Sequence, residues 1–232
     1  TWSKPIELPD PFADHPGGYH FCYTCGKIIR LPDGGLLLGI HGASPDQTRS
    51  TGVVFSRDEG RTWTDYRPVA ADGKRAYYEP SFAVLADGGV LALNRTEPEP
   101  TMYRCVSKDS GRTWSPPERT AIQGDVPELI VLRSGSLLCS YRSQEPGTND
   151  TRMCISRDQG QTWEDEIVID PNGGDHGYTS SVQLPDDSVL TVNYCGKDGC
   201  TQIRSNIVRE SDFDDPPPLE KSGHVAMKDS PT

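Results

Sequence analysis

At 232 residues the chain is long enough for one domain that buries most of the surface its unfolded form exposes. Its formal net charge of −11 makes nucleic acid and anionic membrane surfaces poor partners, because the overall field repels them. No stretch is long and apolar enough to span a membrane. No signal peptide is visible, and the cellular location stays open, although we favour a secreted or extracytoplasmic one.

The cysteine and histidine patterns favour neither a disulfide framework nor a metal site. The seven cysteines are an odd number, and the pair Cys22-x-x-Cys25 has no matching second pair. The histidines His20, His41 and His176 do not have the spacing of metal ligands. We therefore expect thiols that are buried or at strand edges, with at most one bridge, and we expect no metal and no cofactor.

A phrase that recurs three times organises the chain. The pattern S-x-D-x-G-x-T-W occupies residues 56–63, 107–114 and 156–163, and its copies lie about 50 residues apart. Asp and Ser cap their own backbone in turns, Gly supplies a positive φ, and Trp buries a large ring beside the turn. The phrase is typical of a folding device between two strands and predicts no chemistry of its own.

In chain order, the sequence predicts a strand at residues 2–8 and then units of about fifty residues. Each unit opens with an apolar run, a turn such as Asp-Gly or Ser-Gly, and a second apolar run, which is the signature of a β-hairpin. These hairpins occupy residues 27–38, 82–93, 129–138 and 181–190. A third strand then leads into the phrase, and a fourth follows its Trp at 63–69, 114–121 and 163–169.

Four antiparallel strands in about fifty residues is the size of a propeller blade, and 23 Gly and 20 Pro suit the many turns of an all-β fold. The fourth unit has its third strand at 200–209 but neither phrase nor fourth strand, and residues 1–8 could supply that strand and close the ring. We therefore predict a β-propeller over residues 1–210. Residues 211–232, rich in Asp and Pro, are expected to form an exposed or disordered tail.

Two positions of each hairpin are predicted to lie at the end far from its turn. Counted from the last Leu before the turn, the position six residues earlier holds Cys25, Glu79, Val126 and Tyr178. The position ten residues later holds His41, Arg95, Arg142 and Tyr194. Simple hairpin pairing sets the two positions opposite each other, and blade symmetry brings these ends to one rim. Glu79, Arg95, Arg142 and Tyr178 should therefore converge.

The residue types at this rim indicate a binding or catalytic site. Two guanidiniums, Arg95 and Arg142, are well shaped to clamp a ligand carboxylate through paired hydrogen bonds. A Tyr beside a Glu, here Tyr178 and Glu79, can give up its proton and act as a nucleophile. The alternative is that Glu79 and Arg95 form only a cross-strand ion pair while Tyr178 packs the channel.

At these residues the sequence resembles the sialidases (neuraminidases), and the resemblance extends over residues 1–210. The segments that carry it are 78–81 (Tyr-Glu-Pro-Ser), 93–95 (Leu-Asn-Arg), 140–142 (Ser-Tyr-Arg) and 176–181 (His-Gly-Tyr-Thr-Ser-Ser), beside the Asp-containing phrase. The resemblance implies a six-bladed propeller that removes a terminal acidic nine-carbon sugar with retention of configuration. Arg95 and Arg142 would hold the sugar carboxylate, Tyr178 would attack the anomeric carbon, and Glu79 would assist it, an exception to the usual pair of carboxylates.

The sequence departs from that family in two places. It shows four blade units instead of six, and Cys25 stands where the family has its first Arg. Asp46, in the loop at 43–48, is the candidate for the acid/base Asp. The expected partner is a sialylated or other acidic glycan. The alternatives are a non-catalytic propeller that binds acidic glycans or protein, and an Asp-box propeller that is purely structural or binds protein.

Overall fold

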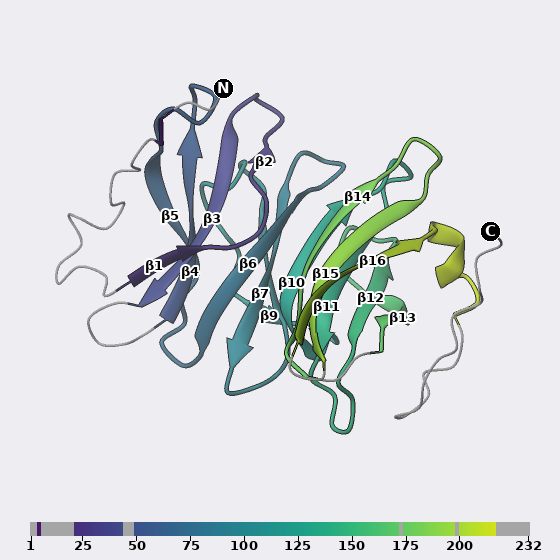
Figure 1. Cartoon of the computed structure of the whole chain (residues 1–232). Coiled ribbons are helices and arrows are strands. Elements are labelled where there is room, and N and C mark those ends of the chain that lie inside the picture. The colour runs from purple at the N-terminus through teal and green to yellow at the C-terminus, as the bar shows by residue number, and fades with distance from the viewer. Residues whose placement is uncertain (1–3, 6–20, 44–48, 172–173, 198–199, 217–232) are drawn as a thin grey trace.

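The computed structural model describes residues 4–5, 21–43, 49–171, 174–197 and 200–216 and shows an all-β chain whose strands form four antiparallel sheets. In Figure 1 the sheet of β1–β5 lies at one side, the sheet of β6–β9 follows it, and the sheets of β10–β13 and β14–β16 overlap at the other side. The predicted propeller class is therefore confirmed.

Each sheet contains one repeat unit of the sequence, and we number these blades 1 to 4. Blade 1 contains β1 (Phe21–Thr24), β2 (Ile29–Arg30), β3 (Leu36–Ala43), β4 (Arg49–Ser56) and β5 (Thr64–Ala70). Blade 2 contains β6 (Ala76–Val84), β7 (Val90–Glu97), β8 (Tyr103–Ser107) and β9 (Glu118–Arg119). Blade 3 contains β10 (Gly124–Val131), β11 (Leu137–Ser143), β12 (Thr151–Ser156) and β13 (Glu164–Asp170), and blade 4 contains β14 (His176–Gln183), β15 (Val189–Lys197) and β16 (Cys200–Val208).

The strands differ from the sequence-based expectation at two points. The strand expected at 114–121 is reduced to Glu118–Arg119, because Pro116 and Pro117 lack the N–H that a sheet ladder requires. The strand expected at 2–8 lies almost entirely outside the described residues, so the closure of blade 4 by that segment stays a prediction.

The chain continues past blade 4 into a short 3-10 helix, η1 (Glu210–Phe213). Phe213 is completely buried in the cluster that joins blades 3 and 4. The composition predicts an exposed or disordered tail from residue 211 onward, and this prediction is wrong for Phe213. The domain boundary at residue 210 stays a prediction. No helix among the described residues is long and apolar enough to cross a membrane.

The hydrophobic core lies between the blades. Three clusters join blade 1 to blade 2, blade 2 to blade 3, and blade 3 to blade 4, and their largest members include Phe55, Tyr77, Leu91, Tyr141 and Ile155. Each sheet thus packs against the next one in the array. The blades consequently hold each other in place by burying apolar surface, which is the main source of stability in such a fold.

The repeated phrase forms the same turn in each of the first three blades. In blade 2, the Asp109 carboxylate accepts hydrogen bonds from the N–H of Thr113 (2.8 Å) and from the hydroxyls of Ser107 (2.8 Å) and Thr113 (2.6 Å). The indole of Trp114 donates to the carbonyl of Gly111 (2.9 Å), and its ring packs on the cluster shared with blade 1. The phrase therefore both closes a turn and attaches one blade to the previous one.

Candidate functional site

A β-bulge recurs in the first strand of blades 2, 3 and 4 and shapes the site. Pairing in blade 2 runs from Ser81 opposite Leu93 directly to Tyr78 opposite Arg95, so Glu79 and Pro80 together face only one residue of β7. The same shift occurs between Asp125 and Glu128 and between Gly177 and Ser180. A bulge of this kind redirects side chains out of the sheet.

The first residue of each bulge is the one predicted for the rim. Glu79, Val126 and Tyr178 all have positive φ, at 45°, 49° and 47°. Such values are uncommon for residues other than Gly and are found where the surrounding structure imposes them. The expectation that Glu79 lies opposite Arg95, Val126 opposite Arg142 and Tyr178 opposite Tyr194 is therefore wrong by one residue, because the bulge adds a residue to one strand only.

The structure nevertheless brings the predicted residues of blades 2 and 4 into contact. The Tyr178 hydroxyl donates a hydrogen bond of 2.5 Å to Oε1 of Glu79, although 99 residues separate the two in sequence. Nη1 of Arg95 donates to the other oxygen, Oε2, at 3.1 Å. Glu79 is buried, whereas Tyr178 is 50% exposed. The carboxylate is thus held from one side by a guanidinium and from the other by a phenol that solvent can reach.

Burial, and then the hydrogen bond and charge of Glu79, raise the pKa of Tyr178 well above its usual value. The phenol is therefore neutral at physiological pH. The Tyr178 hydroxyl already donates a hydrogen bond to Glu79. The Glu79 carboxylate is therefore the group positioned to accept the proton if Tyr178 forms a bond to carbon.

Carboxylates surround the Arg95 guanidinium. Besides Glu79, it contacts Glu97 through Nη2 at 2.9 Å and Asp125 through Nε at 3.3 Å. Asp125 is buried, and burial raises the pKa of its carboxyl, while Arg95 and Arg142 act in the opposite direction. One guanidinium therefore balances several acids.

Arg142, the second arginine predicted to bind a ligand carboxylate, belongs to β11 of blade 3 and lies beside Tyr178 of blade 4. Its Nε donates to the carbonyl of His176 (2.5 Å), and its Nη2 contacts Asp175 (3.3 Å) and the hydroxyl of Tyr194 (3.1 Å). Its guanidinium carbon lies 5.9 Å from the centre of the Tyr178 ring. Both predicted guanidiniums therefore flank the Tyr178–Glu79 pair.

Cys25 takes the equivalent place in blade 1. Its Sγ lies 3.6 Å from Nε2 of His41. Burial, and then the charge of Glu79, raise the pKa of this thiol to about 11. A protonated thiol is a poor nucleophile and carries no positive charge, so Cys25 does not take over the task of an arginine.

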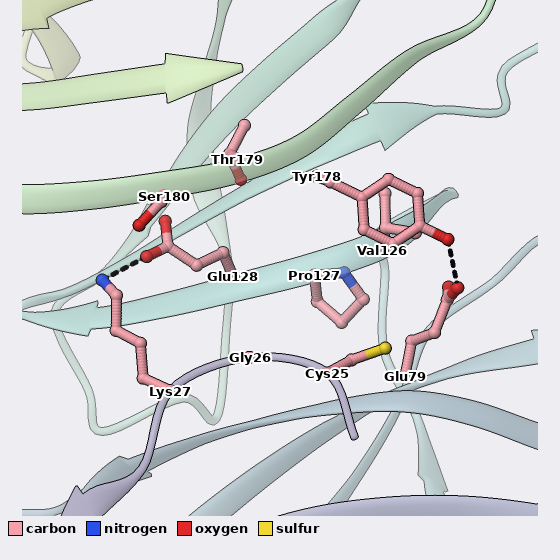
Figure 2. A pocket seen from close by; sticks show the side chains of 10 residues that line it. All are labelled: Cys25, Gly26, Lys27, Glu79, Val126, Pro127, Glu128, Tyr178, Thr179 and Ser180. Carbon is pink, nitrogen blue, oxygen red and sulfur yellow. Dashed lines mark hydrogen bonds and ion pairs between the residues drawn. The ribbon is translucent and has the colours of Figure 1, made fainter. Parts of the chain in front are cut away.

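A pocket of about 250 Å³ opens between the first strands of the blades, and Figure 2 shows Tyr178 and Glu79 at one end of it and Lys27 and Glu128 at the other. Its lining residues are Cys25, Gly26, Lys27, Glu79, Val126, Pro127, Glu128, Tyr178, Thr179 and Ser180. Arg95 and Arg142 are not among them. Arg95 instead contacts Glu79, and Arg142 contacts Tyr178, and both of these residues line the pocket.

One predicted site residue is not described by the structure, and three residues at the site were not predicted. Asp46 lies outside the described residues, so nothing tests its role. The sequence does not single out Asp125 and Asp175, because a lone Asp near a turn is usually a turn former, and it does not single out Lys27 either. In the described part of the chain, no group of at least three His, Cys, Asp or Glu side chains is arranged to hold a metal ion.

An Asp-containing turn between the last two strands of blades 1, 2 and 3 defines an Asp-box β-propeller. The chain belongs to the BNR repeat-like domain family, whose model matches residues 1–192. It is 26% identical over 213 residues to a sialidase of Bacteroides fragilis and 29% identical over 140 residues to a sialidase of Paraclostridium sordellii. These matches cover 84% and 53% of this chain but only 37% and 33% of the relatives, so the chain spans about a third of their length.

Solved structures show the same fold. A protein of unknown function from Dyadobacter fermentans superimposes with a TM-score of 0.79 at 26% identity, covering 89% of this chain and 60% of that one. Trypanosoma rangeli sialidase in complex with sialic acid superimposes with a TM-score of 0.65 at 16% identity, covering 92% of this chain and 36% of that one. These likenesses show the fold, while the membership in the BNR repeat-like domain family rests on the family model.

Proposed function

We propose that this propeller is a sialidase-like glycoside hydrolase that removes a terminal acidic nine-carbon sugar, with retention, through a covalent adduct on Tyr178. The observation that carries the proposal is the 2.5 Å hydrogen bond from the Tyr178 hydroxyl to Glu79 at the mouth of the pocket. Arg95 and Arg142 flank that pair, and the similarity to sialidases supports the same chemistry.

In the proposed reaction, the Tyr178 oxygen forms a bond to the anomeric carbon while its proton passes to Glu79. The bond from that carbon to the leaving-group oxygen breaks, and an acid, for which Asp46 is the candidate, protonates the oxygen. Water then gives up a proton to the carboxylate left on that acid and displaces the tyrosyl oxygen, which regains its proton from Glu79, so two inversions give net retention. A neutral phenol approaches an anionic sugar without the repulsion that a carboxylate nucleophile would meet.

Arg95 and Arg142 are proposed to bind the sugar carboxylate by charge-assisted hydrogen bonds. The substrate therefore has to displace part of the contacts these side chains make with Asp125, Glu97 and Asp175. The exposed edge of Tyr178 would then face the anomeric carbon.

The test is turnover of a fluorogenic sialoside by the protein and its variants. Tyr178→Phe and Glu79→Gln should each lower kcat by roughly 10²-fold or more, because one removes the nucleophile and the other removes its base. Tyr103→Phe, which removes a phenol that donates to Glu99 in blade 2, is the matched control and should retain activity. A folded wild type that does not turn the sialoside over would rule out the hydrolase.

A second candidate function is a non-catalytic propeller that binds acidic glycans. The observation that favours it is Cys25, a protonated thiol at the blade 1 position where sialidases have an arginine. Binding to a glycan array that is lost in Arg95→Ala and Arg142→Ala, without hydrolysis, would support this candidate over the first.

A further inference from the structure

Tyr194 of β15 lies against both Arg142 and Tyr178 at the rim. Its hydroxyl donates to Oδ1 of Asp175 at 2.7 Å and accepts a hydrogen bond from Nη2 of Arg142 at 3.1 Å. Its ring stacks on the ring of Tyr178, with centroids 6.0 Å apart and planes inclined by 28°. A single side chain thus contacts a proposed clamp residue and the proposed nucleophile.

The hydroxyl of Tyr194 is fixed by these two bonds. A phenol has one proton to donate, here to a carboxylate, and its oxygen then accepts from a guanidinium, so the two bonds reinforce each other. Burial, and then the hydrogen bond to Asp175, raise the pKa of Tyr194, which keeps the hydroxyl protonated. Together with the bond from Nε to the His176 carbonyl, this contact fixes two of the three nitrogens of the Arg142 guanidinium.

Contacts with Arg142 and Tyr194 hold the ring of Tyr178 in its orientation. The guanidinium carbon of Arg142 lies 5.9 Å from the Tyr178 ring centre, and the Tyr194 ring stacks on the same ring. Tyr178 is half exposed and sits on a bulge at positive φ, so few other contacts hold its ring. Loss of the Tyr194 ring would let the nucleophile move.

We propose that Tyr194 is a positioning residue whose hydroxyl orients Arg142 toward an anionic ligand and whose ring holds Tyr178 in its attacking orientation. The inference rests on the proposed function, because it concerns the same site. It assigns separate tasks to two parts of one side chain, and each part can be removed separately.

The first experiment compares Tyr194→Phe with Tyr194→Leu in turnover of the fluorogenic sialoside. The Phe variant should raise KM about 3–10-fold with kcat within about twofold of wild type, because it loses one hydrogen bond but keeps the stacked ring. The Leu variant should in addition lower kcat by about tenfold or more. Tyr103→Phe serves again as the control, and unchanged unfolding midpoints exclude a general loss of structure.

The second experiment measures binding of free sialic acid and of its carboxylate methyl ester by NMR titration. If Tyr194 acts through Arg142, Tyr194→Phe should weaken the acid about 3–10-fold and leave the ester unchanged, whereas a merely structural role would weaken both alike. Equal losses, or wild-type values of KM, kcat and acid affinity in Tyr194→Phe, would overturn the inference.

The outcomes also separate the two proposals. A wild type that binds sialic acid without turnover fails as a hydrolase, yet the comparison of acid with ester still decides the role of Tyr194 toward Arg142. A wild type that neither turns over the sialoside nor binds the acid overturns both proposals.

Discussion

At the scale of single residues, the balance of charge around Arg95 is the unusual feature of the site. Its three contacts with Glu79, Glu97 and Asp125 set one positive charge against several negative ones. Asp125 also accepts a hydrogen bond from Gln144 (2.9 Å), which keeps its carboxyl beside the guanidinium. An incoming carboxylate would therefore meet Asp125 directly, and like charges in a partly buried site repel strongly.

We predict that Asp125→Asn tightens binding of sialic acid at neutral pH by roughly fivefold, the equivalent of about 1 kcal/mol. Burial raises the pKa of Asp125, so its negative charge disappears as pH falls through a value above the ordinary Asp range. Wild-type affinity should consequently rise as pH falls through that value, and the variant should lack this part of the dependence. The other charged groups that face Asp125 are Arg95, Arg142, Glu79 and Glu97.

The measurement is the dissociation constant for sialic acid between pH 4.5 and 8, with Asp215→Asn as a control that removes one exposed acid. Weaker binding by Asp125→Asn at every pH would show that Asp125 supports Arg95 more than it repels the ligand. Glu79→Gln should not reproduce the effect on its own, since it also removes the carboxylate that accepts the Tyr178 hydrogen bond.

The sequence reveals Glu79, Arg95, Arg142 and Tyr178 because these residue types are out of place at strand ends that normally carry Val, Ile or Leu. Their roles stay predictions, although the structure places the four side chains around one rim. Asp175, Asp125 and Tyr194 could not be assigned partners in the same way. Their contacts depend on side-chain directions at the bulges, and a repeat count along the chain does not contain that information.

At the scale of elements, the bulge decides which residues face one another. Counting outward from a hairpin turn assumes one residue opposite one residue, and this fails wherever an extra residue is inserted. Pro80 and Pro127, each the second residue of a bulge, were the available signal, because a residue without an N–H is tolerated where the ladder is interrupted. In blade 4 the same place holds Thr179, so there the sequence gives no such signal.

The Asp-box turns are the second element whose behaviour can be predicted. Hydrogen bonds from Thr113 and Ser107, which outweigh the effect of burial, lower the pKa of Asp109 to about 2. An acid whose pKa is depressed in the folded state contributes stability above its unfolded pKa of about 4, and that contribution is lost as pH falls toward 2. Because Asp109 is exposed, solvent screening reduces this contribution well below what the pKa shift alone implies, and Asp109→Asn should cost roughly 1 kcal/mol at pH 7 and less at pH 2.5.

Urea unfolding at the two pH values measures this cost, and Asp215→Asn, at an exposed acid, is the control that should change stability little. A cost that is equal at both pH values would mean that the hydrogen-bonding shape of residue 109, and not its charge, stabilises the turn. The same substitution should leave sialoside turnover at neutral pH unchanged, because the turn serves the packing of Trp114 and not the rim.

At the scale of the whole molecule, the blade repeat was predictable because its spacing is written along the chain. The packing between blades followed from it, since each blade exposes apolar faces that only a neighbouring blade can cover. How the ends of the array are covered depends on contacts between segments far apart in sequence. Buried Phe213 shows the limit of composition, because an Asp-rich segment with a single large apolar side chain reads as a tail.

Besides the bond from Tyr178 to Glu79, a second contact joins blades that are not neighbours in the array. Lys27, between β1 and β2, forms an ion pair with Glu128 of blade 3 and donates to the carbonyl of Ser181 in blade 4 at 2.5 Å. The Glu128 side chain is only 6% exposed, and it also accepts bonds from the N–H (2.8 Å) and hydroxyl (2.5 Å) of Ser181. Figure 2 shows this pair closing the pocket at the end opposite Tyr178.

We predict that Lys27→Met destabilises the protein by about 1–2 kcal/mol in urea unfolding, because it leaves a buried carboxylate without its countercharge. The half-exposed lysine and the remaining bonds to Ser181 keep the loss below that of a fully buried pair. Lys74→Met, at an exposed lysine of the turn between blades 1 and 2, is the matched control and should be nearly neutral. The double variant Lys27→Met/Glu128→Gln should recover part of the stability, since the uncompensated charge is gone. If Lys27→Met proves neutral, the ion pair with Glu128 does not contribute to the stability of the array.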